Sequence, residues 1–372
     1  MRFPEFSGEW KMCTIGELIT KVGSGVTPRG GEAVYKTEGH PFVRSQNVGL
    51  GNLLLDDIAF IDEETHLRQK NTELQFNDVL LNITGASIGR SALVDKQIVG
   101  GNVNQHVCII RTKENLVPSF ICSFLLSNYG QRQIDSFQAG GNRQGLNFEQ
   151  IKSIKITIPS KDEQIKIAKL LRAIDERIAT QNKIIDKLQS LIKGLRVCCM
   201  QRNGSNNVYL SEIAQIYQPQ TISSAELTED GFLVYGANGI IGKYKDYNHK
   251  TEQICITCRG NTCGMVNYTK PMSWITGNAM VINTDKYQDK VYKKYLYHYL
   301  SAYNFNSIIS GSGQPQIVRT PLEKLKITLP TISEQKQKAM ILDKVQDKIE
   351  INHNILNLYI LQKQYLLRQM FI

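Results

Sequence analysis

The side chains most able to do chemistry in this sequence lie in glycine-rich polar loops. Arg, Asn and Gln can make paired hydrogen bonds to base edges, Ser and Thr can bind phosphate, and Gly lets the backbone approach closely. In the first half of the chain the candidates are Thr27, Arg29, Arg44, Gln46, Asn47, Thr84, Ser87, Arg90, Asn104, Gln105, Asn142, Arg143 and Gln144. In the second half they are Tyr235, Asn238, Arg259, Asn261, Thr262, Trp274, Asn278, Gln314 and Gln316. Any one such cluster is better explained as a turn, but their recurrence at matching places favours nucleic-acid binding.

The charge balance agrees with a polyanionic partner. The 372 residues include 44 Lys and Arg against 34 Asp and Glu, a net charge of +10. A basic excess favours nucleic acid, although many basic proteins bind none. The N-terminus does not resemble a signal peptide and no segment is long and apolar enough to span a membrane. We therefore expect a cytoplasmic protein with no membrane association, whose eight cysteines are reduced.

Motifs typical of enzymes are mostly absent from the sequence. The one Gly-Lys pair, Gly242-Lys243, is followed by Tyr, so there is no phosphate-binding loop of the G-x-x-x-x-G-K-[ST] type. No Pro-Pro pair occurs, which excludes the Asp/Asn-Pro-Pro-aromatic motif of amino-methyltransferases. The glycine-rich stretches 22–25 and 310–313 lack the spacing of a dinucleotide site. We expect no catalytic residues and no cofactor.

A possible zinc site is formed by Cys255, Cys258 and Cys263, with His249 as a fourth ligand. The counterpart stretch in the first half, residues 83–89, contains neither Cys nor His. A metal that stabilises only one copy of a duplicated fold is a poor explanation, so we expect no metal site.

These loops must be positioned by a fold that the chain encodes twice. Residues 154–164 (IKITIPSKDEQ) return at 325–335 (LKITLPTISEQ), an offset of 171. Strands are expected at 76–84, 104–111 and 154–158 in the first copy, and at 253–257 and 279–283 in the second. One helix is expected over 118–135 and its counterpart over 292–309. A protein built from two such units suggests a target that is recognised at two places.

A long helix follows each unit. Pro159-Ser160-x-x-Glu163 and Pro330-Thr331-x-x-Glu334 both resemble capping boxes that open a helix. Apolar residues then recur at alternating spacings of four and three from Ile167 to Cys199, and less purely from Lys338 to Met370. This pattern predicts two helices that pack as a coiled coil.

Each helix carries an amide at the equivalent position of this apolar seam, Gln181 in the first and Asn352 in the second. If the helices pack antiparallel, the two amides can meet near the middle and fix the register. The alternative is that both amides face solvent.

Taken together, these features resemble the DNA-specificity subunits of type I restriction–modification systems. In that family two variable target-recognition domains alternate with two helical spacers, each opened by a Pro-x-x-x-Glu-Gln motif. Residues 159–164 and 330–335 match the motif, and Gly25-Val-Thr-Pro28 resembles an element of the first recognition domain. The second domain lacks that element and has Tyr217-Gln-Pro-Gln220 nearby.

The resemblance implies an α+β fold with two similar target-recognition domains bridged by two long antiparallel coiled-coil helices. The expected parts are 1–158 (first domain), 159–200 (first helix), 201–329 (second domain) and 330–372 (second helix). Each domain would read one half of a bipartite asymmetric site in double-stranded DNA, with the helices setting the gap. Two methyltransferase subunits and the restriction/translocase subunits are the implied protein partners.

Two other functions remain open from the sequence. One is a stand-alone nuclease or methyltransferase with an unrecognised site, which would bind a metal or S-adenosylmethionine. The other is a coiled-coil interaction protein with no role on DNA, which the loop composition and the charge oppose.

Overall fold

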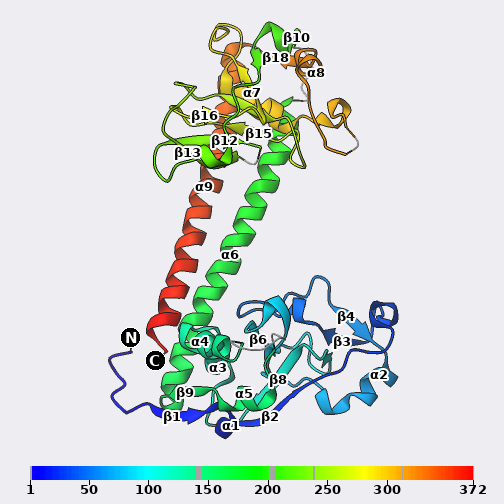
Figure 1. Ribbon diagram of the computed structural model, residues 1–372, viewed down its shortest axis with the longest axis vertical. Coiled ribbons are helices and arrows are strands. Elements are labelled where there is room, and N and C mark those ends of the chain that lie inside the picture. The colour runs from blue at the N-terminus through cyan, green and yellow to red at the C-terminus, as the bar shows by residue number, and fades with distance from the viewer. Residues whose placement is uncertain (1, 139–144, 201–205, 238, 312, 372) are drawn as a thin grey trace. The chain divides into compact units, whose positions relative to one another are not determined.

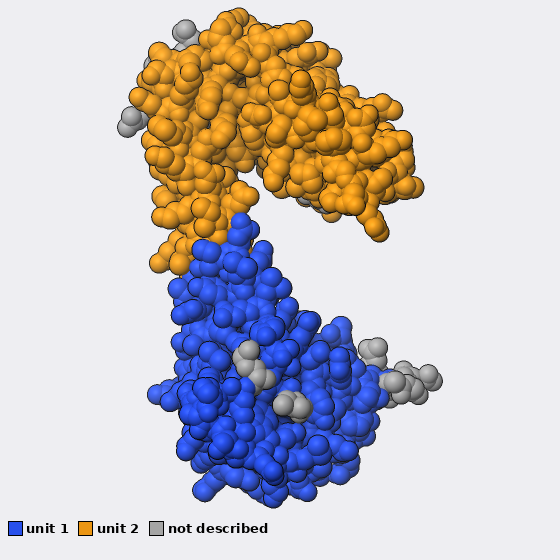
Figure 2. Space-filling view, turned by 90° about the vertical axis from the view of Figure 1, so that its left-hand side faces the viewer, with its two compact units in different colours: residues 1–182, 354–372 blue, residues 183–353 orange. Residues whose placement is uncertain are grey.

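The computed structural model describes residues 2–371 except 139–144, 201–205, 238 and 312. The chain forms two compact units, Met1–Asn182 with Asn354–Ile372, and Lys183–His353 (Figure 2). Two long helices, α6 (Lys161–Met200) and α9 (Ile332–Gln369), each contribute one part to each unit.

The domain within the first unit is built on three sheets (Figure 1). Its four-stranded antiparallel sheet has the order β2-β8-β5-β6, its three-stranded sheet β4-β3-β7, and its two-stranded sheet β1-β9. The strands are β1 (Lys11–Thr14), β2 (Ile19–Ser24), β3 (His40–Val43), β4 (Ala59–Ile61), β5 (Val79–Asn82), β6 (Ser91–Leu93), β7 (Asn102–Val103), β8 (Val107–Thr112) and β9 (Lys155–Ile158). The helices are α1 (Ile15–Leu18), α2 (Glu63–Arg68), α3 (Pro118–Leu126), α4 (Asn128–Ser136) and α5 (Phe148–Ser153).

The domain within the second unit repeats all three sheets. Their orders are β11-β17-β14-β15, β13-β12-β16 and β10-β18. The strands are β10 (Asn206–Tyr209), β11 (Gln215–Tyr217), β12 (Phe232–Gly236), β13 (Gly239–Tyr244), β14 (Ile254–Thr257), β15 (Val266–Tyr268), β16 (Trp274–Ile275), β17 (Ala279–Asn283) and β18 (Lys326–Leu329). The helices are α7 (Lys293–Ala302) and α8 (Arg319–Glu323).

The four-stranded sheet of each domain is buried on both faces. In β5, Val79 and Leu81 pack on the face that meets α3, while Leu80 packs in a separate cluster on the other face. In β14, Ile254 and Ile256 pack with α7, while Cys255 faces the opposite cluster. Short runs of continuous apolar residues are typical of strands buried on both faces.

The two shorter helices that the sequence predicts as continuous are interrupted. The stretch 118–135 divides into α3 and α4 at Ser127, whose backbone is extended and whose hydroxyl caps α4 by accepting from the Gly130 amide at 3.1 Å. The stretch 292–309 divides at Tyr303 into α7 and a 3₁₀ turn at Phe305–Ile308. A serine cap competes with continuation of a helix, so periodicity alone does not reveal such breaks.

Helices α6 and α9 pack antiparallel, as the resemblance implies. In the first unit the start of α6 (Ile167, Leu171) shares a hydrophobic cluster with Leu366, near the end of α9, and with Met370, which follows the helix. In the second unit the end of α6 meets the start of α9, with Ile192 packed in one cluster with Leu342 and Ile349. No residue of either predicted seam is fully exposed. Gln181 is 7% exposed and Asn352 is half-buried, and their pairing remains a prediction.

The capping boxes differ between the two helices. At α9, the Thr331 amide donates to Glu334 (2.9 Å) and the Glu334 amide donates to the Thr331 hydroxyl (3.3 Å), so the predicted box is formed. At α6, the carboxylate of Glu163 is buried and accepts two hydrogen bonds of 2.8 Å from the Arg2 guanidinium.

The glutamine that ends each Pro-x-x-x-Glu-Gln motif fastens its helix to the neighbouring domain. Gln164 accepts from the Val117 amide at 2.9 Å and donates to two carbonyls, of Asn115 and Pro159, at 3.1 Å each. Gln335 makes the same three bonds at 2.8–3.1 Å, to the Tyr292 amide and to the carbonyls of Lys290 and Pro330. We call each set of three bonds a glutamine latch. The latches explain why the motif recurs, because each joins a long helix to the start of α3 or α7.

Among the helices that the structure describes, none combines the length and apolar character that crossing a membrane requires.

Candidate nucleic-acid interface

The polar loops of the first domain meet at one end of its four-stranded sheet. β5 and β8 run antiparallel, so the loop after Asn82 and the loop before Val107 lie at the same end. The Ile83 amide donates to the His106 carbonyl at 3.0 Å. Thr84 forms an isolated bridge with Gly145. We call the loops gathered here, residues 27–29, 44–47, 84–90 and 104–106, the first platform.

A chain of side-chain hydrogen bonds joins three loops of the first platform. The backbone amide of Thr27 donates to Gln105 Oε1 at 2.8 Å, and Gln105 Nε2 donates to His106 Nε2 at 3.2 Å. His106 Nδ1 is in turn hydrogen-bonded to the Thr84 hydroxyl. Sequence reasoning missed His106, because an isolated histidine gives no sign of which loop it will contact.

An open depression of about 420 Å³ lies on this platform. Its side-chain lining includes Gln46, Thr84, Ser87, Arg90 and His106, so four of the predicted residues are brought to one place. Gln46 and Arg90 are exposed. The depression therefore offers hydroxyl, amide and guanidinium groups to one ligand surface.

The loops of the second domain converge in the same way. The Gly260 amide donates to the Pro315 carbonyl and the Cys258 amide to the Asn278 carbonyl, both at 3.0 Å. The Thr262 hydroxyl donates to the Ala237 carbonyl at 3.1 Å. Residues 235–237, 259–265, 274–278 and 314–316 form the second platform. Gln218, which the sequence did not single out, donates from its side chain to the Gly277 carbonyl.

One turn occurs in both platforms with the same backbone. It is Thr84–Arg90 after β5 (the β5 turn) and Arg259–Met265 after β14 (the β14 turn). Its second and sixth residues are glycines in the left-handed region, with φ of +73° and +84° in the β5 turn and +87° and +91° in the β14 turn. Four equivalent backbone hydrogen bonds of 2.8–3.2 Å hold each turn. The turn is therefore a duplicated scaffold that carries different side chains.

A buried polar residue beneath each turn anchors it to the loop after β3 or β12. Asn82, at the end of β5, donates to the Ser45 carbonyl at 2.8 Å and to the Ser87 hydroxyl at 3.1 Å. Thr257, at the end of β14, donates to the Ala237 carbonyl at 2.6 Å. Both residues are fully buried. The turns are thus held in place without the exposed side chains.

Several predicted residues support the loops rather than face solvent. The Arg44 side chain is 14% exposed, and its guanidinium is paired with Asp57 at 3.2 Å. Asn47 and Asn104 are buried and accept backbone amides of their own loops. Tyr235 is 5% exposed, and its hydroxyl accepts from the Lys270 amide at 3.1 Å.

The remaining predicted residues have more accessible positions. Trp274 is half-buried beside the ring of Tyr244. The exposed ones are Arg29, Gln46, Arg90, Gln105, Arg259, Asn261, Asn278, Gln314 and Gln316. Asn142, Arg143, Gln144 and Asn238 lie outside the described residues.

Each domain has a place at or beside its platform where two backbones approach closely. A Cβ at Gly25, in the Gly-x-Thr-Pro element, would lie 1.7 Å from the Val103 carbonyl oxygen. In the second domain the glycine is Gly277, where a Cβ would lie 2.4 Å from Thr221 Oγ1 and 2.9 Å from the Pro219 carbonyl oxygen. The second domain therefore lacks the Gly-x-Thr-Pro element and has its closely packed glycine in the loop between β16 and β17.

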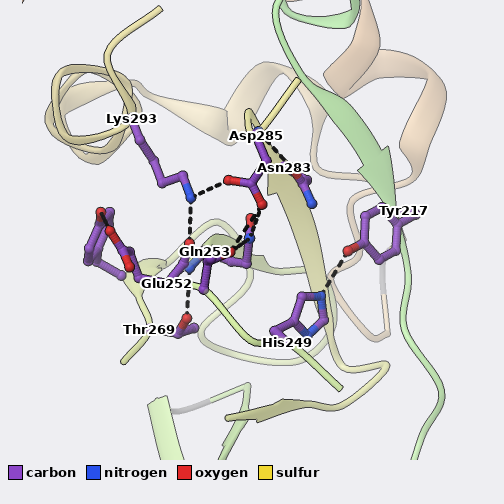
Figure 3. Close-up of polar contacts among 10 residues, drawn as sticks. Tyr217, His249, Glu252, Gln253, Thr269, Asn283, Asp285 and Lys293 are labelled. Carbon is purple, nitrogen blue, oxygen red and sulfur yellow. Dashed lines mark hydrogen bonds and ion pairs between the residues drawn. The ribbon is translucent and has the colours of Figure 1, made fainter. Parts of the chain in front are cut away.

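A dense group of ionisable side chains in the second domain lies beyond the opposite end of β14 and β17. Asp285 accepts from Lys293 at 2.7 Å and from Gln253 at 2.9 Å (Figure 3). Burial raises the pKa of Asp285, but these hydrogen bonds outweigh it, so the net pKa is lowered. His249 is paired with the Tyr217 hydroxyl at 2.8 Å, and burial lowers its pKa. The partners of Asp285 satisfy it within the protein, as in a structural clamp.

The cysteines of the possible zinc site do not converge. Cys255 and Cys258 pack in different hydrophobic clusters, and burial raises the pKa of the Cys255 thiol to about 12. Within the described part of the chain, no group of three or more His, Cys, Asp or Glu side chains is arranged to hold a metal ion.

Comparison with known proteins shows in which family this architecture occurs. The model of the type I restriction modification DNA specificity domain matches residues 7–190 and again 203–358. A putative type I restriction enzyme MjaX specificity subunit from Methanocaldococcus jannaschii is 23% identical, over 93% of this chain and 89% of its own.

Solved structures show the same fold. The S subunit of a type I restriction–modification system from M. genitalium has a TM-score of 0.66 at 16% identity, covering 100% of this chain and 99% of its own. A chain from a structure on complex assembly and conformational transition of the type I R-M system has a TM-score of 0.58 at 15% identity, covering 98% and 97%. Since the two matches to the domain model span most of its length, this chain belongs to the type I restriction modification DNA specificity domain family.

Proposed function

We propose that the chain is the DNA-specificity subunit of a type I restriction–modification complex, in which each platform reads one half of a bipartite, asymmetric DNA site. The observation that carries the proposal is the duplicated platform. Both domains gather glycine-rich turns with hydroxyl, amide and guanidinium groups at the same end of the same sheet. Different side chains on equivalent backbones favour different sequences in the two halves.

The gap between the halves is assigned to the long helices. Helices of 40 and 38 residues have lengths of about 60 and 57 Å at 1.5 Å per residue. One DNA turn spans about 34–36 Å, so helices of this length can separate two half-sites by more than a turn. The glutamine latches support this role, since each fixes a domain to one helix.

The protein partners follow from the relatives and from the helix surfaces. The relatives are subunits of type I restriction enzymes, so we assign two methyltransferase subunits and the restriction/translocase subunits as partners, acting in the cytoplasm. Large apolar residues lie exposed on the helices, including Leu191 (49%) on α6 and Leu358 (64%) and Leu361 (60%) on α9. Exposed apolar rows on a helix are typical of surfaces that a partner covers.

We further propose that the chain itself catalyses neither methyl transfer nor cleavage. The family description is one of DNA specificity, and the sequence lacks the Asp/Asn-Pro-Pro-aromatic motif of amino-methyltransferases and the G-x-x-x-x-G-K-[ST] phosphate-binding loop. The purified chain should not bind S-adenosylmethionine in calorimetry. Methylation of DNA by the chain alone would favour the stand-alone enzyme instead.

The test of DNA reading is selection from a randomised pool of double-stranded DNA with the full chain, followed by sequencing of the bound fraction. We expect a motif of two short blocks separated by a constant unread gap. A single contiguous motif would contradict the bipartite assignment. No enrichment over the input pool would contradict sequence-specific binding altogether.

A further inference from the structure

The two turns share one backbone but carry their arginine at opposite ends. In the β5 turn the first residue is Thr84 and the seventh is Arg90. In the β14 turn the first residue is Arg259 and the seventh is Met265. Because the glycines and the backbone hydrogen bonds are equivalent, this exchange changes where a guanidinium is presented without changing the scaffold.

Both arginines are available to a ligand. Arg90 and Arg259 are exposed, and neither side chain has an ion pair or hydrogen bond to any residue that the structure describes. Arg44, in contrast, is largely buried and paired with Asp57. A free guanidinium on a rigid turn can bind guanine O6 and N7 with two parallel hydrogen bonds.

The other end of each turn is occupied differently. Thr84 is half-buried, and its hydroxyl is committed to His106. Met265 is 46% exposed and offers no hydrogen bond to a base edge beyond its weakly accepting sulfur. Each turn therefore presents one guanidinium, from a different end.

Resting on the proposed function, we propose that Arg90 and Arg259 are the guanine-specificity residues of the first and second half-sites. The position of the arginine on the shared turn sets which base pair of its half-site is read as guanine. The first domain reads from the seventh position and the second domain from the first.

Selection from the same randomised DNA pool tests this with three variants of the full chain. Arg259→Ala should weaken the preference for guanine at one position of one half-site by roughly 5- to 150-fold. This is the discrimination expected of one bidentate contact. Arg90→Ala should do the same in the other half-site. The double variant Arg259→Thr with Met265→Arg copies the first domain's arrangement, and should move the required guanine to another position of the second half-site.

Two controls separate reading from general attraction. Arg259→Lys keeps the charge but not the planar fork, so it should retain most affinity and lose the guanine preference. Arg319→Ala removes an exposed arginine of α8, paired with Glu323, from the same domain and should leave the motif unchanged. The other base positions of the altered half-site serve as an internal check that the altered domain is folded, because an unfolded domain would lose its whole half-site.

The outcomes are distinguishable from failure of the proposed function. If wild type selects a bipartite motif and Arg259→Ala selects the same motif with uniformly weaker binding, the arginine contacts phosphate and the inference is wrong. If Arg259→Lys behaves as wild type, the inference is also wrong. If wild type selects no motif, the proposed function itself fails.

Discussion

The two domains have the same sheets but secure the far end of the main sheet with different chemistry. In the first domain Asp78, before β5, and Arg111, in β8, form a bidentate pair with both distances 2.7 Å. In the second domain the corresponding strands are joined by Gln253 and Asp285, with Lys293 as a third member. The comparison shows that both domains have a polar connection at this end, made by different side chains. Each domain can therefore vary its polar side chains while its backbone stays the same.

The largest expected difference between the domains concerns the Asp78–Arg111 pair of the first domain. Asp78 is 1% exposed, so Arg111→Met leaves a buried carboxylate without its cation. We expect the first unit to lose about 3–5 kcal/mol of unfolding free energy. Lys293→Met should cost only about 1 kcal/mol, because Asp285 is 33% exposed and keeps its bond from Gln253. Hydrogen exchange resolved by segment measures each unit separately, which matters since two units do not unfold as one. Equal losses of unfolding free energy would show that the Asp78–Arg111 pair and the Asp285–Lys293 pair contribute equally to stability.

Loss of a glutamine latch should give the next largest effect, and the loss of stability should be similar in the two domains. Gln164→Leu and Gln335→Leu each leave a partly buried amide and two carbonyls without these hydrogen bonds, at a cost of about 3 kcal/mol. Urea titration monitored by segment-resolved exchange provides the comparison, with Gln181→Leu as a control that removes a seam amide instead. A loss in one domain and none in the other would end the claim that the latches are equivalent.

The helix caps should differ by a smaller amount. Thr331→Ala removes a formed capping box and should destabilise the start of α9 by about 1 kcal/mol. Ser160→Ala should cost less, because its hydroxyl lies 3.4 Å from the Glu163 amide while the Glu163 carboxylate binds Arg2. Exchange rates of the first amides of each helix report the difference. A greater loss at α6 than at α9 would reverse this ranking.

The domains should also differ in their response to pH. His298 of α7 is fully buried, and burial lowers its pKa despite the hydrogen bond to Asp343. Nearby Arg196 also lowers the pKa, as does Lys294, which is itself paired with Asp343. His298 therefore binds a proton more tightly in the unfolded chain than in the folded one. Its contribution to stability is complete above the unfolded pKa of about 6.5 and is lost as the pH falls below that value.

The measurement is exchange protection of α7 and α3 between about pH 7.5 and 5.5, corrected for intrinsic rates. α7 should lose protection towards low pH. The counterpart of His298 in α3 is Ser123, which does not titrate. The variant His298→Gln should remove most of the pH dependence. Unchanged dependence in that variant would assign it to other groups.

Much of this fold could be predicted from sequence because its strongest signals are local. The repeat at 154–164 and 325–335, the seam from Ile167 to Cys199 and the apolar strands all follow from spacing. The break at Ser127 could not be predicted, since its cap competes with an otherwise helical pattern. The latch of Gln164 was equally invisible, because the two partners that join it to the neighbouring domain lie 47 and 49 residues away.

The candidate site was predictable in composition but not in arrangement. Recurrence of polar loops pointed to Thr84 and Arg259, and the structure places both on equivalent turns. The sequence could not show that Asn47 and Asn104 would be buried, or that His106 would connect two loops. Side chains in such loops are chosen by contacts across the sheet, which leave no periodic signal in the sequence.

The central claim is that two domains read two half-sites at a distance set by the helices. It is tested most directly by inserting one heptad after Gln181 in α6 and one after Asn352 in α9, which lengthens both helices by about 10.5 Å while keeping the seam. The methylated motif is then sequenced in a host that carries the chain with its methyltransferase partner. The account predicts the same two blocks of bases with a gap longer by about three base pairs, at 3.4 Å each. The same blocks with an unchanged gap, or a single contiguous motif, would contradict it.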